Sequence, residues 1–425
     1  MHILFLTDNF PPEVNAPASR TFEHCRLWVS AGHKVTVITC APNFPLGRVF
    51  SGYRNRLVQR EEIEGISVVR VWSYITRNEG TLRRTLDYVS FMFSSMFASI
   101  FVRRVDVVVG TSPQFFTTCA AWVVGAVKRK AFVFELRDLW PESIKAVGAM
   151  KNERILGMLE RIELFLYRHA ARVVSVTHSF RRNLQERGID PGKVEVITNG
   201  VDLSRFAPRP RDAALAEKLG LTGKFVAGYV GTHGMAHGLE TLLEAARILK
   251  SGPDADRFRI VLLGDGARKA DLQRLAGEMG LDNVVFVDTV DKAEVPKYWS
   301  LLDVSIIHLR KTELFSTVIP SKLFECMGMG LPVLHGVEGE SAEIVRRERV
   351  GIVFPPEDAV ALAAGIRRFR QDPAFAAECR QSATSAAGHY DRTKLGMDML
   401  RVLESVVGRP STLPPADPAG PVQGG

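Results

Sequence analysis

Residues 225–239 read Phe225-Val226-Ala227-Gly228-Tyr229-Val230-Gly231-Thr232-His233-Gly234-Met235-Ala236-His237-Gly238-Leu239. The first six residues form an apolar run, which predicts a buried strand. A glycine-rich loop follows, and the residues after it have a helical pattern. Glycines in such a loop let backbone N–H groups approach a phosphate closely. The stretch therefore predicts a strand–loop–helix unit with a candidate anion site that includes Gly231, Thr232 and His237.

The same alternation of short apolar runs with helical patterns extends in both directions along the chain. It is typical of doubly wound parallel sheets, and 425 residues suit two domains. A turn and two prolines within 199–212 indicate a hinge. We predict an α/β protein with Rossmann-like domains at 1–205 and 206–390, and a Pro/Gly-rich disordered tail at 408–425. Strands are expected near 2–7, 35–39, 66–72, 105–109, 132–135, 172–176, 194–197, 225–230, 259–263, 284–287, 304–308 and 332–334.

Positive charge is concentrated in the first half of the chain. Residues 1–205 hold 28 Lys+Arg against 19 Asp+Glu, giving +9, and residues 206–425 hold 27 against 28, giving −1. Such asymmetry is compatible with nucleic acid, an anionic membrane or a solvated basic face. No basic helix with interleaved aromatic residues favours nucleic acid. Five scattered cysteines without a C-x-x-C pair argue against disulfides and a zinc knuckle, and the absence of a secretory signal pattern leads us to expect a cytoplasmic protein.

Residues 86–102 form an apolar, aromatic-rich stretch with a helical pattern, flanked by Arg83-Arg84 and Arg103-Arg104. A membrane-spanning helix needs about 20 apolar residues, whereas this stretch contains Asp87 and several serines. A buried core helix and a helix on a membrane surface are therefore equally good interpretations, ahead of a span.

The strongest chemical signal is Pro320-Ser321-Lys322-Leu323-Phe324-Glu325, which predicts a helix start. Proline suits a first helical turn, where free N–H groups favour an anion, and Lys322 adds a positive charge there. Glu325 shares a helix face with Lys322 and could accept hydrogen bonds from two ribose hydroxyls. This helix is expected to bind a nucleoside diphosphate, although an exposed Lys–Glu pair would also fit the pattern.

A second group of charges follows the strand expected near 132–135, where Arg137, Asp138 and Glu142 lie. Loops at the carboxyl ends of strands collect catalytic groups. Asp138 could orient or deprotonate a hydroxyl and Arg137 could hold a phosphate, but an ion pair bracing the loop would explain both. His178 is a further candidate because it follows a strand end.

Two other patterns are weaker. Gly264 and Gly266 follow a strand and could line a nucleotide cleft or form an ordinary tight turn. No histidine spacing indicates a metal site, and Asp254-Ala255-Asp256 is expected in a solvent turn. The glycine loop is not the G-x-G-x-x-G fingerprint, so an NAD-dependent dehydrogenase is disfavoured. We expect neither a metal nor a bound cofactor.

With these motifs together, the chain resembles the retaining family 4 glycosyltransferases with two Rossmann-like domains, in particular the bacterial branch for O-antigen and capsule sugars. The likeness covers roughly residues 1–407. The motifs that carry it are Phe10-Pro11-Pro12-Glu13, Pro17-Ala18-Ser19-Arg20, Ala31 to Thr39, Arg137-Asp138-Leu139-Trp140-Pro141-Glu142-Ser143, Asn199-Gly200-Val201-Asp202 and Pro320 to Glu325.

The resemblance implies a B-type fold with a cleft between an acceptor domain at 1–205 and a donor domain at 206–390. It also implies that helix 391–407 packs back on the first domain. The donor would be a nucleotide-linked N-acetylated amino sugar and the acceptor a polyprenyl-diphosphate-linked sugar at the inner face of the cytoplasmic membrane. No metal would be required.

Three departures from the family pattern matter. Many members have a glutamate eight positions before the one matching Glu325, but this chain has Thr317, with Glu313 the nearest carboxylate upstream. Many also have an arginine and a lysine where this chain has Thr232 and His237.

The first-domain glycine pair is also absent, being Asn15-Ala16 here. We hypothesise that Lys322, with Arg310 or Lys311, replaces the missing Arg/Lys pair in stabilising the leaving diphosphate. A nucleotide-sugar epimerase and an inactive sugar-nucleotide-binding subunit are the alternative functions.

Overall fold

The computed structural model describes residues 1–13, 15–44, 47–76, 81–140, 142, 152–252 and 254–408. The chain divides into two compact units, residues 1–198 with the segment from 393 onward, and residues 199–392. The first boundary lies at residue 198 rather than 205, because residues from 199 onward already pack with the second unit. The Val201 N–H donates to the Tyr390 carbonyl, and the Arg392 N–H donates to the Val201 carbonyl. The tail predicted to be disordered lies, after residue 408, outside the described residues.

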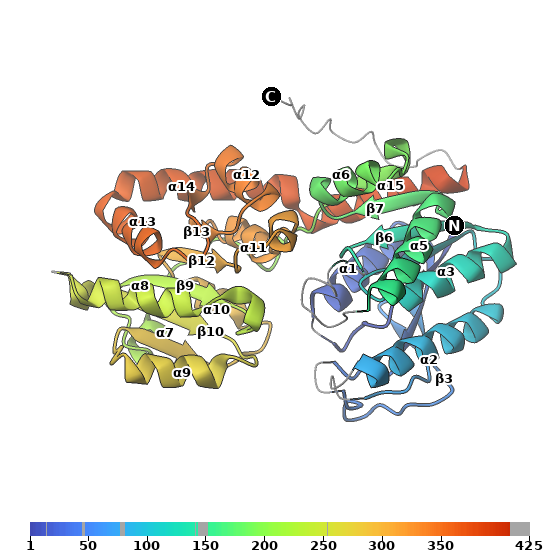
Figure 1. The fold of residues 1–425 in the computed structure, drawn as a ribbon, viewed down its shortest axis with the longest axis horizontal. Helices are drawn as coiled ribbons and strands as arrows, with labels where there is room; N and C mark the ends of the chain where they lie inside the picture. The colour runs from blue at the N-terminus through green and yellow to red at the C-terminus, as the bar shows by residue number, and fades with distance from the viewer. Residues whose placement is uncertain are drawn as a thin grey trace. The chain divides into compact units, whose positions relative to one another are not determined.

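The first unit is a twisted sheet covered by helices on both faces (Figure 1). Its strands are β1 (His2–Leu6), β2 (Lys34–Cys40), β3 (Val58–Ile63), β4 (Ile66–Val71), β5 (Val107–Thr111), β6 (Ala131–Leu136), β7 (Arg172–Ser175) and β8 (Val194–Val196). Its helices are α1 (Ala16–Ser30), α2 (Thr81–Ile100), α3 (Phe115–Lys128), α5 (Glu153–His169), α6 (His178–Glu186), the 3-10 helix η1 (Pro191–Lys193) and α15 (Arg392–Val407). The strand order is β3-β4-β2-β1-β5-β6-β7-β8, with only β3 antiparallel to its neighbour among the described strands.

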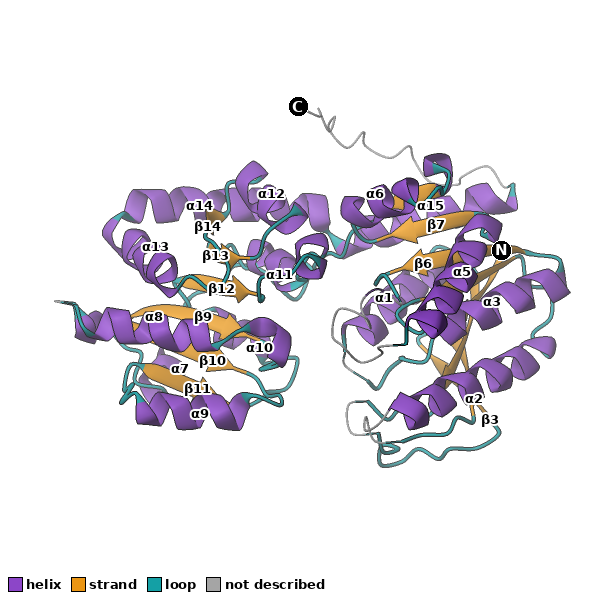
Figure 2. Ribbon diagram, in the orientation of Figure 1, coloured by secondary structure: helices purple, strands orange, loops and turns teal. Residues whose placement is uncertain are grey.

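The second unit repeats this architecture with a smaller sheet (Figure 2). Its strands are β9 (Phe225–Val230), β10 (Phe258–Leu263), β11 (Val284–Val287), β12 (Val304–His308), β13 (Val333–Gly336) and β14 (Gly351–Val353). Its helices are α7 (Ala213–Lys218), α8 (Glu240–Lys250), α9 (Lys269–Glu278), α10 (Val295–Trp299), α11 (Lys322–Gly328), α12 (Glu340–Arg347), α13 (Ala359–Gln371) and α14 (Pro373–Ala387), with 3-10 turns η2 (Met235–His237), η3 (Ala255–Arg257), η4 (Leu314–Thr317) and η5 (Gly388–Tyr390). The parallel order β11-β10-β9-β12-β13-β14 is that of a Rossmann fold.

The predicted α/β fold class is confirmed, and each predicted strand overlaps an observed one. Two strands were not predicted from the sequence. β3 is an edge strand whose Val-Gln-Arg-Glu-Glu-Ile sequence is mostly polar and partly exposed along its length, so it has no apolar run to reveal it. β14 has three residues, which is too short for a periodic signal.

Helix α15 returns to the first unit and completes its core. Leu395, Met399, Leu400 and Leu403 are buried against the sheet in the same cluster as Trp28 of α1. The Trp28 indole N–H also donates to the Gly396 carbonyl at 2.9 Å. The last helix is therefore an integral part of the first unit, although the second unit separates it in sequence.

Candidate active site

The sheet of the second unit opens at the point where its strand order reverses. β9 pairs with β10 along its whole length, but with β12 only through Ala227–Val304 and Gly228–Ser305. Ligands of open α/β sheets bind at the carboxyl ends of strands at such a point. A cavity of about 440 Å³ lies there. It is lined by Phe206, Val230, Gly231, Thr232, His237, Lys292, Val295, Ile307, His308, Leu309, Val318, Ile319, Pro320, Ser321, Lys322 and Glu325.

The cavity brings together two motifs that lie about 90 residues apart in the sequence. The loop after β9 contributes three of the residues predicted to bind the donor, and the start of α11 contributes four. These seven residues are Gly231, Thr232, His237, Pro320, Ser321, Lys322 and Glu325.

Lys322 is held against the wall of the cavity by Tyr229. Its Nζ donates to the Tyr229 hydroxyl at 2.7 Å and lies 3.9 Å from the centroid of the tyrosine ring. The Tyr229 hydroxyl in turn donates to the Thr232 carbonyl at 2.8 Å. Burial lowers the pKa of Lys322 to about 8, although the charge of Glu325 opposes this shift. Lys322 is therefore positioned in the cavity and still cationic at neutral pH.

Gly231 is the residue that lets Lys322 reach this position. A Cβ on Gly231 would lie 2.3 Å from the Lys322 Cε, and its φ of 139° is unfavourable for other residues. The contact explains the glycine in the predicted anion loop by close approach to a lysine side chain. Tyr229 was not predicted as a site residue, because within an apolar strand it reads as core.

Two histidines of the loop after β9 are neutral. Burial, with a contribution from Lys322, lowers the pKa of both His233 and His237 to about 4. His308 of β12 accepts the Glu357 N–H at Nε2 and therefore donates from Nδ1 to the His237 carbonyl at 2.7 Å. This bond fixes the loop to β12, and the positive charge in this part of the wall comes from Lys322.

Glu325 lines the cavity three residues after Lys322 on α11, in a cationic environment. Burial raises the pKa of its carboxyl. The charges that lower it come from Arg392, Lys322, Lys292 and Arg205. Of these, Lys292 also lines the cavity and was not predicted, because it lies in a polar turn without a motif.

Several predicted residues have positions that differ from those expected. Arg310 does not line the cavity, since its Nε donates to the Met235 carbonyl at 2.8 Å and its guanidinium faces Glu240 at 3.5 Å. Lys311 pairs with Glu338 at 3.2 Å. The hypothesis that Arg310 or Lys311 assists Lys322 at the diphosphate therefore has no support from their placement.

Gly264 and Gly266 pack against the backbone of the loop that follows β9. A Cβ on Gly264 would lie 2.0 Å from the Gly231 carbonyl oxygen, and one on Gly266 would lie 2.6 Å from that of His233. Neither glycine lines the cavity. Both positions therefore require glycine because the two loops pack closely there.

Helix α11 begins at Lys322, so Pro320 precedes the helix instead of occupying its first turn. The Leu323 and Phe324 N–H groups already donate to the Pro320 and Ser321 carbonyls. The positive charge at this site therefore comes mainly from the Lys322 ammonium and less from the start of the helix. Thr317, which stands where the family has a glutamate, donates to the Leu314 carbonyl at 2.7 Å and lies outside the cavity wall.

The candidate residues of the first unit lie at the carboxyl end of its sheet. The Arg137 and Asp138 N–H groups both donate to the Ser112 hydroxyl, at 2.8 and 3.2 Å, which fixes the loop after β6. The Arg137 guanidinium donates to the Pro17 carbonyl at 3.3 Å. Glu142 is exposed. These bonds hold Arg137 and Asp138 beside the start of α1, where they remain half-buried.

Asn15 and His178 have structural positions at helix starts. The Asn15 side chain accepts the Ala18 N–H at 2.8 Å and so caps α1. His178 is the exposed first residue of α6. Arg20 belongs to a motif of the family resemblance but was not predicted as a site residue; its guanidinium donates to Glu135 of β6 at 3.0 Å and to the Thr198 carbonyl at 2.8 Å.

No group of three or more metal-ligating side chains occurs in the part of the chain that the structure describes. Within the same residues, no helix is long and apolar enough to cross a membrane.

Comparison with known proteins accounts for both units. A model for Glycosyltransferase Family 4 matches residues 18–205, and one for Glycosyl transferases group 1 matches residues 224–372. The chain is 26% identical over 382 residues to the putative colanic acid biosynthesis glycosyl transferase WcaI of Escherichia coli K12, covering 87% of this chain and 92% of that protein.

Solved structures share the fold. Sucrose-phosphate synthase from Thermosynechococcus elongatus superposes with a TM-score of 0.77 at 17% identity, covering 96% of this chain and 99% of that one. Anabaena HepE in complex with UDP-glucose gives a TM-score of 0.70 at 17% identity, covering 95% and 100%. The predicted B-type fold is thereby confirmed. The two domain matches and the WcaI relative together identify the chain as a glycosyltransferase, with a first unit similar to Glycosyltransferase Family 4 and a second unit similar to Glycosyl transferases group 1.

Proposed function

We propose that this glycosyltransferase binds a nucleotide diphosphate-sugar in the cavity of its second unit and transfers the sugar, with retention, to a lipid-linked acceptor during cell-surface polysaccharide synthesis. The observation that carries the proposal is the placement of Lys322 and Glu325 on one wall of a cavity at the strand-order reversal. The relation to a protein named for colanic acid biosynthesis supports the polysaccharide role. The UDP-glucose complex of a protein with the same fold supports the donor class.

The charges of the cavity suit the departure of a nucleoside diphosphate. As the bond between the anomeric carbon and the diphosphate oxygen breaks, negative charge develops on the phosphate, and a fixed ammonium stabilises it. Lys322 is already held in place by Tyr229, so little reorganisation is needed. Lys292 supplies a second cation, and with both lysines the reaction needs no metal. Glu325 would accept the ribose hydroxyls.

Retention places the acceptor hydroxyl on the face that the diphosphate leaves. The acceptor oxygen forms the new bond to the anomeric carbon, and its proton passes to the departing phosphate oxygen. Asp138 would orient the acceptor rather than act as an obligatory base. By resemblance to its family branch, the donor sugar is an N-acetylated amino sugar and the acceptor carries a polyprenyl diphosphate.

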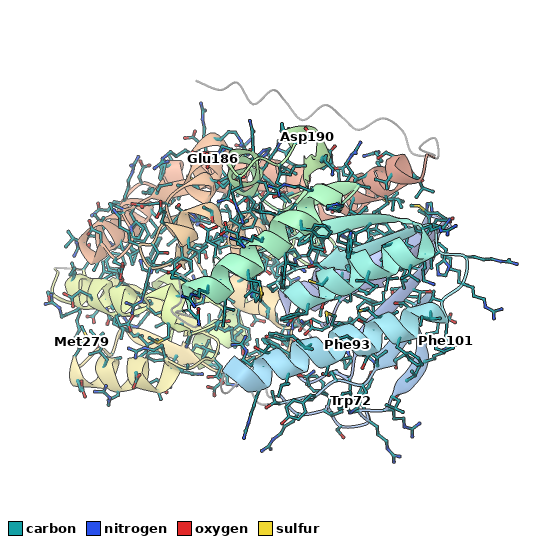
Figure 3. The ribbon with its side chains drawn as sticks, turned by 45° about the vertical axis from the view of Figure 1, so that its right-hand side comes forward. Trp72, Phe93, Phe101, Glu186, Asp190 and Met279 are labelled. Atoms are coloured by element: carbon teal, nitrogen blue, oxygen red, sulfur yellow. The ribbon has the colours of Figure 1, made fainter. Side chains whose placement is uncertain are left out.

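A membrane surface is the proposed location of the acceptor, at the inner face of the cytoplasmic membrane. One face of α2 packs on the sheet of the first unit, and the other exposes large apolar side chains, among them Phe93 (Figure 3). Arginine pairs flank this stretch in the sequence, at 83–84 and 103–104. Isolated exposed apolar residues are ordinary, but a contiguous stripe marks an interaction site, and basic flanks favour anionic lipid. The stripe comprises Leu86, Phe93, Phe97, Ile100 and the following Phe101, which are 49–62% exposed.

The test is turnover with radiolabelled UDP-, GDP- and dTDP-sugars in membranes that contain polyprenyl-diphosphate sugars, with Glu325→Gln as the control variant. Lipid-extractable label that depends on Glu325 supports the proposal and identifies the donor. An altered sugar nucleotide released without acceptor would instead indicate an epimerase. Nucleotide binding without any turnover across the panel would indicate a binding subunit, and either result would overturn the proposal.

A further inference from the structure

A second cavity, of about 530 Å³, lies at the amino-terminal edge of the first sheet. It is formed where β1, β2, β3 and β4 meet the segment that follows α2. The lining residues are Met1, His2, Lys34, Thr36, Arg60, Ser67, Val69, Phe101, Val102, Arg103 and Arg104.

The cavity concentrates positive charge from distant parts of the sequence. Lys34 begins β2, Arg60 lies on β3, and Arg103 and Arg104 follow α2. None of the described lining residues is acidic, and within the described residues no ion pair involves Arg60, Arg103 or Arg104. Four basic residues therefore line one cavity in whose described wall no carboxylate lies, which is the charge pattern of an anion site.

Buried hydrogen bonds hold the segment that carries the two adjacent arginines. The His2 ring bonds the Arg103 carbonyl at 3.0 Å through Nδ1 and the Thr36 hydroxyl at 2.8 Å through Nε2. Burial lowers the pKa of His2, so its ring is neutral and links the Arg103 carbonyl to the Thr36 hydroxyl. Asp106 accepts the His2 N–H at 2.8 Å, which directs this carboxylate to the strand backbone. The arginines thus project from a fixed segment.

The cavity is distinct from the candidate active site. It belongs to the first unit, whereas the cavity with Lys322 belongs to the second. Within the first unit it lies at the amino ends of β1 and β2, while Arg137 and Asp138 follow the carboxyl end of β6. Strands of five to seven residues separate these edges by roughly 15–25 Å.

An apolar surface adjoins the cationic cavity. Phe101 lines the cavity and is 57% exposed, and Ile100 beside it is 62% exposed. Figure 3 shows Phe93 on α2 and Phe101 directly after its end. Arg103 and Arg104 follow Phe101 in the sequence. A soluble phosphate compound offers nothing to bury these side chains, whereas a phospholipid presents its phosphate directly above acyl chains.

We propose that this cavity binds the phosphate group of an anionic phospholipid, with Ile100 and Phe101 inserting beside it into the acyl region. The proposal rests on the membrane contact of the proposed function and adds a defined headgroup site to it. Arginine pairs with phosphate oxygens through parallel N–H donors. Such a site would fix the position of the first unit on the bilayer, beyond the general attraction of a basic surface.

The test compares the full-length protein with Arg60→Gln/Arg103→Gln in sedimentation with vesicles of phosphatidylglycerol and phosphatidylcholine. Each basic residue near an anionic surface contributes roughly fivefold to partitioning, so removing two of them should weaken vesicle binding about 25-fold. The matched control is Arg129→Gln/Lys130→Gln, which removes the same charge from exposed positions before β6, outside the cavity. Thermal unfolding verifies that both variants fold.

A large loss in the cavity variant with a small loss in the control supports a headgroup site. Equal losses in both variants would reduce the effect to general surface charge and overturn the proposal, as would no loss in either. Inorganic phosphate is titrated in a further arm against chloride at matched ionic strength. If the protein binds phosphate in the cavity but does not bind the vesicles, the ligand is a soluble phosphate, and this result would also overturn the proposal. UDP, GDP and dTDP binding on the same samples reports on the donor site, so failure of the headgroup site is distinguishable from failure of the proposed function.

Discussion

Replacing Lys322 by methionine should make the empty protein more stable and the donor site weaker. Methionine keeps an unbranched chain of similar length against Tyr229 but removes the ammonium that lies in the cavity wall. A residue retained only for packing would show the opposite behaviour. The environment of Lys322 allows the change in stability and the change in nucleotide affinity to be estimated one after the other.

The stability term follows from the pKa of Lys322. A drop from 10.5 to about 8 corresponds to about 3 kcal/mol at about 1.4 kcal/mol per pKa unit. Because the side chain lines an open cavity that water reaches, we take about half of this, and the lost hydrogen bond to Tyr229 offsets about 0.5 kcal/mol. The variant should therefore unfold with a free energy about 1 kcal/mol larger at pH 7.

The pH dependence of that term has a defined sign. The folded protein has the lower pKa for Lys322, so the unfolded chain binds more protons between pH 8 and 10.5. The wild type should consequently gain stability as the pH rises through this window. Lys322→Met should lack this gain, which separates the buried charge from other effects of the substitution.

The binding term has the opposite sign. A hydrogen bond to a charged group contributes roughly 1.5–3 kcal/mol, so nucleoside diphosphate affinity should fall by roughly 10- to 150-fold. Calorimetric titration with UDP, GDP and dTDP measures it, and thermal unfolding without nucleotide measures stability. Lys297→Met is the control, since Lys297 pairs with Glu294 on the surface. A variant that is less stable than the wild type and binds the nucleotide equally well would refute the reasoning, because Lys322 would then be a structural residue.

Four further predictions follow from single contacts. Gly231→Ala places a methyl group 2.3 Å from the Lys322 Cε, and calorimetry should show at least a tenfold loss of nucleotide affinity. His233 is buried with a pKa of about 4, so it should by itself cost the second unit up to about 3 kcal/mol as pH falls from 6.5 to 4; in thermal unfolding, His233→Phe should remove this share and leave the share of His237. Burial raises the pKa of Asp87 to about 6, so this carboxyl should by itself cost the first unit roughly 1–2 kcal/mol as pH rises from 4 to 6, a share that Asp87→Asn should remove. Leu403→Ala should destabilise the first unit by about 2–5 kcal/mol in denaturant unfolding; a change below 0.5 kcal/mol would contradict the packing of α15.

The residues of the candidate site that the sequence predicted are those that belong to local motifs. Lys322 and Glu325 share one turn of a helix, and Gly231 lies in a glycine loop after an apolar strand, so neighbours in the sequence reveal them. Tyr229 and Lys292 were missed because their role depends on contacts across the sheet. Tyr229 acts only through a lysine 93 residues away, and no periodic pattern carries that information.

Proximity in the sequence also misled the prediction of Arg310. It lies close to Glu325 along the chain, but it follows β12, and its guanidinium is directed to the Met235 carbonyl and to Glu240. The same limit applies to Asn15, whose position matches a binding loop of the family and whose side chain caps α1. Residue type and spacing restrict the candidates, and backbone hydrogen bonds decide which of them point into the cavity.

The stretch at 86–102 shows how one sequence pattern can leave two interpretations open. An α-helix that is apolar on all sides predicts burial without indicating the neighbour. In the structure, Phe91 and Ala98 are buried against the first unit, whereas Phe93 and Phe97 are about 60% exposed on the other side. The first pair is explained by the core of the protein. The second pair has no such explanation, and water alone would favour polar side chains at those positions. The proposed membrane contact would account for the remaining half of the pattern, because the arginines at both ends of the helix would then lie beside anionic headgroups.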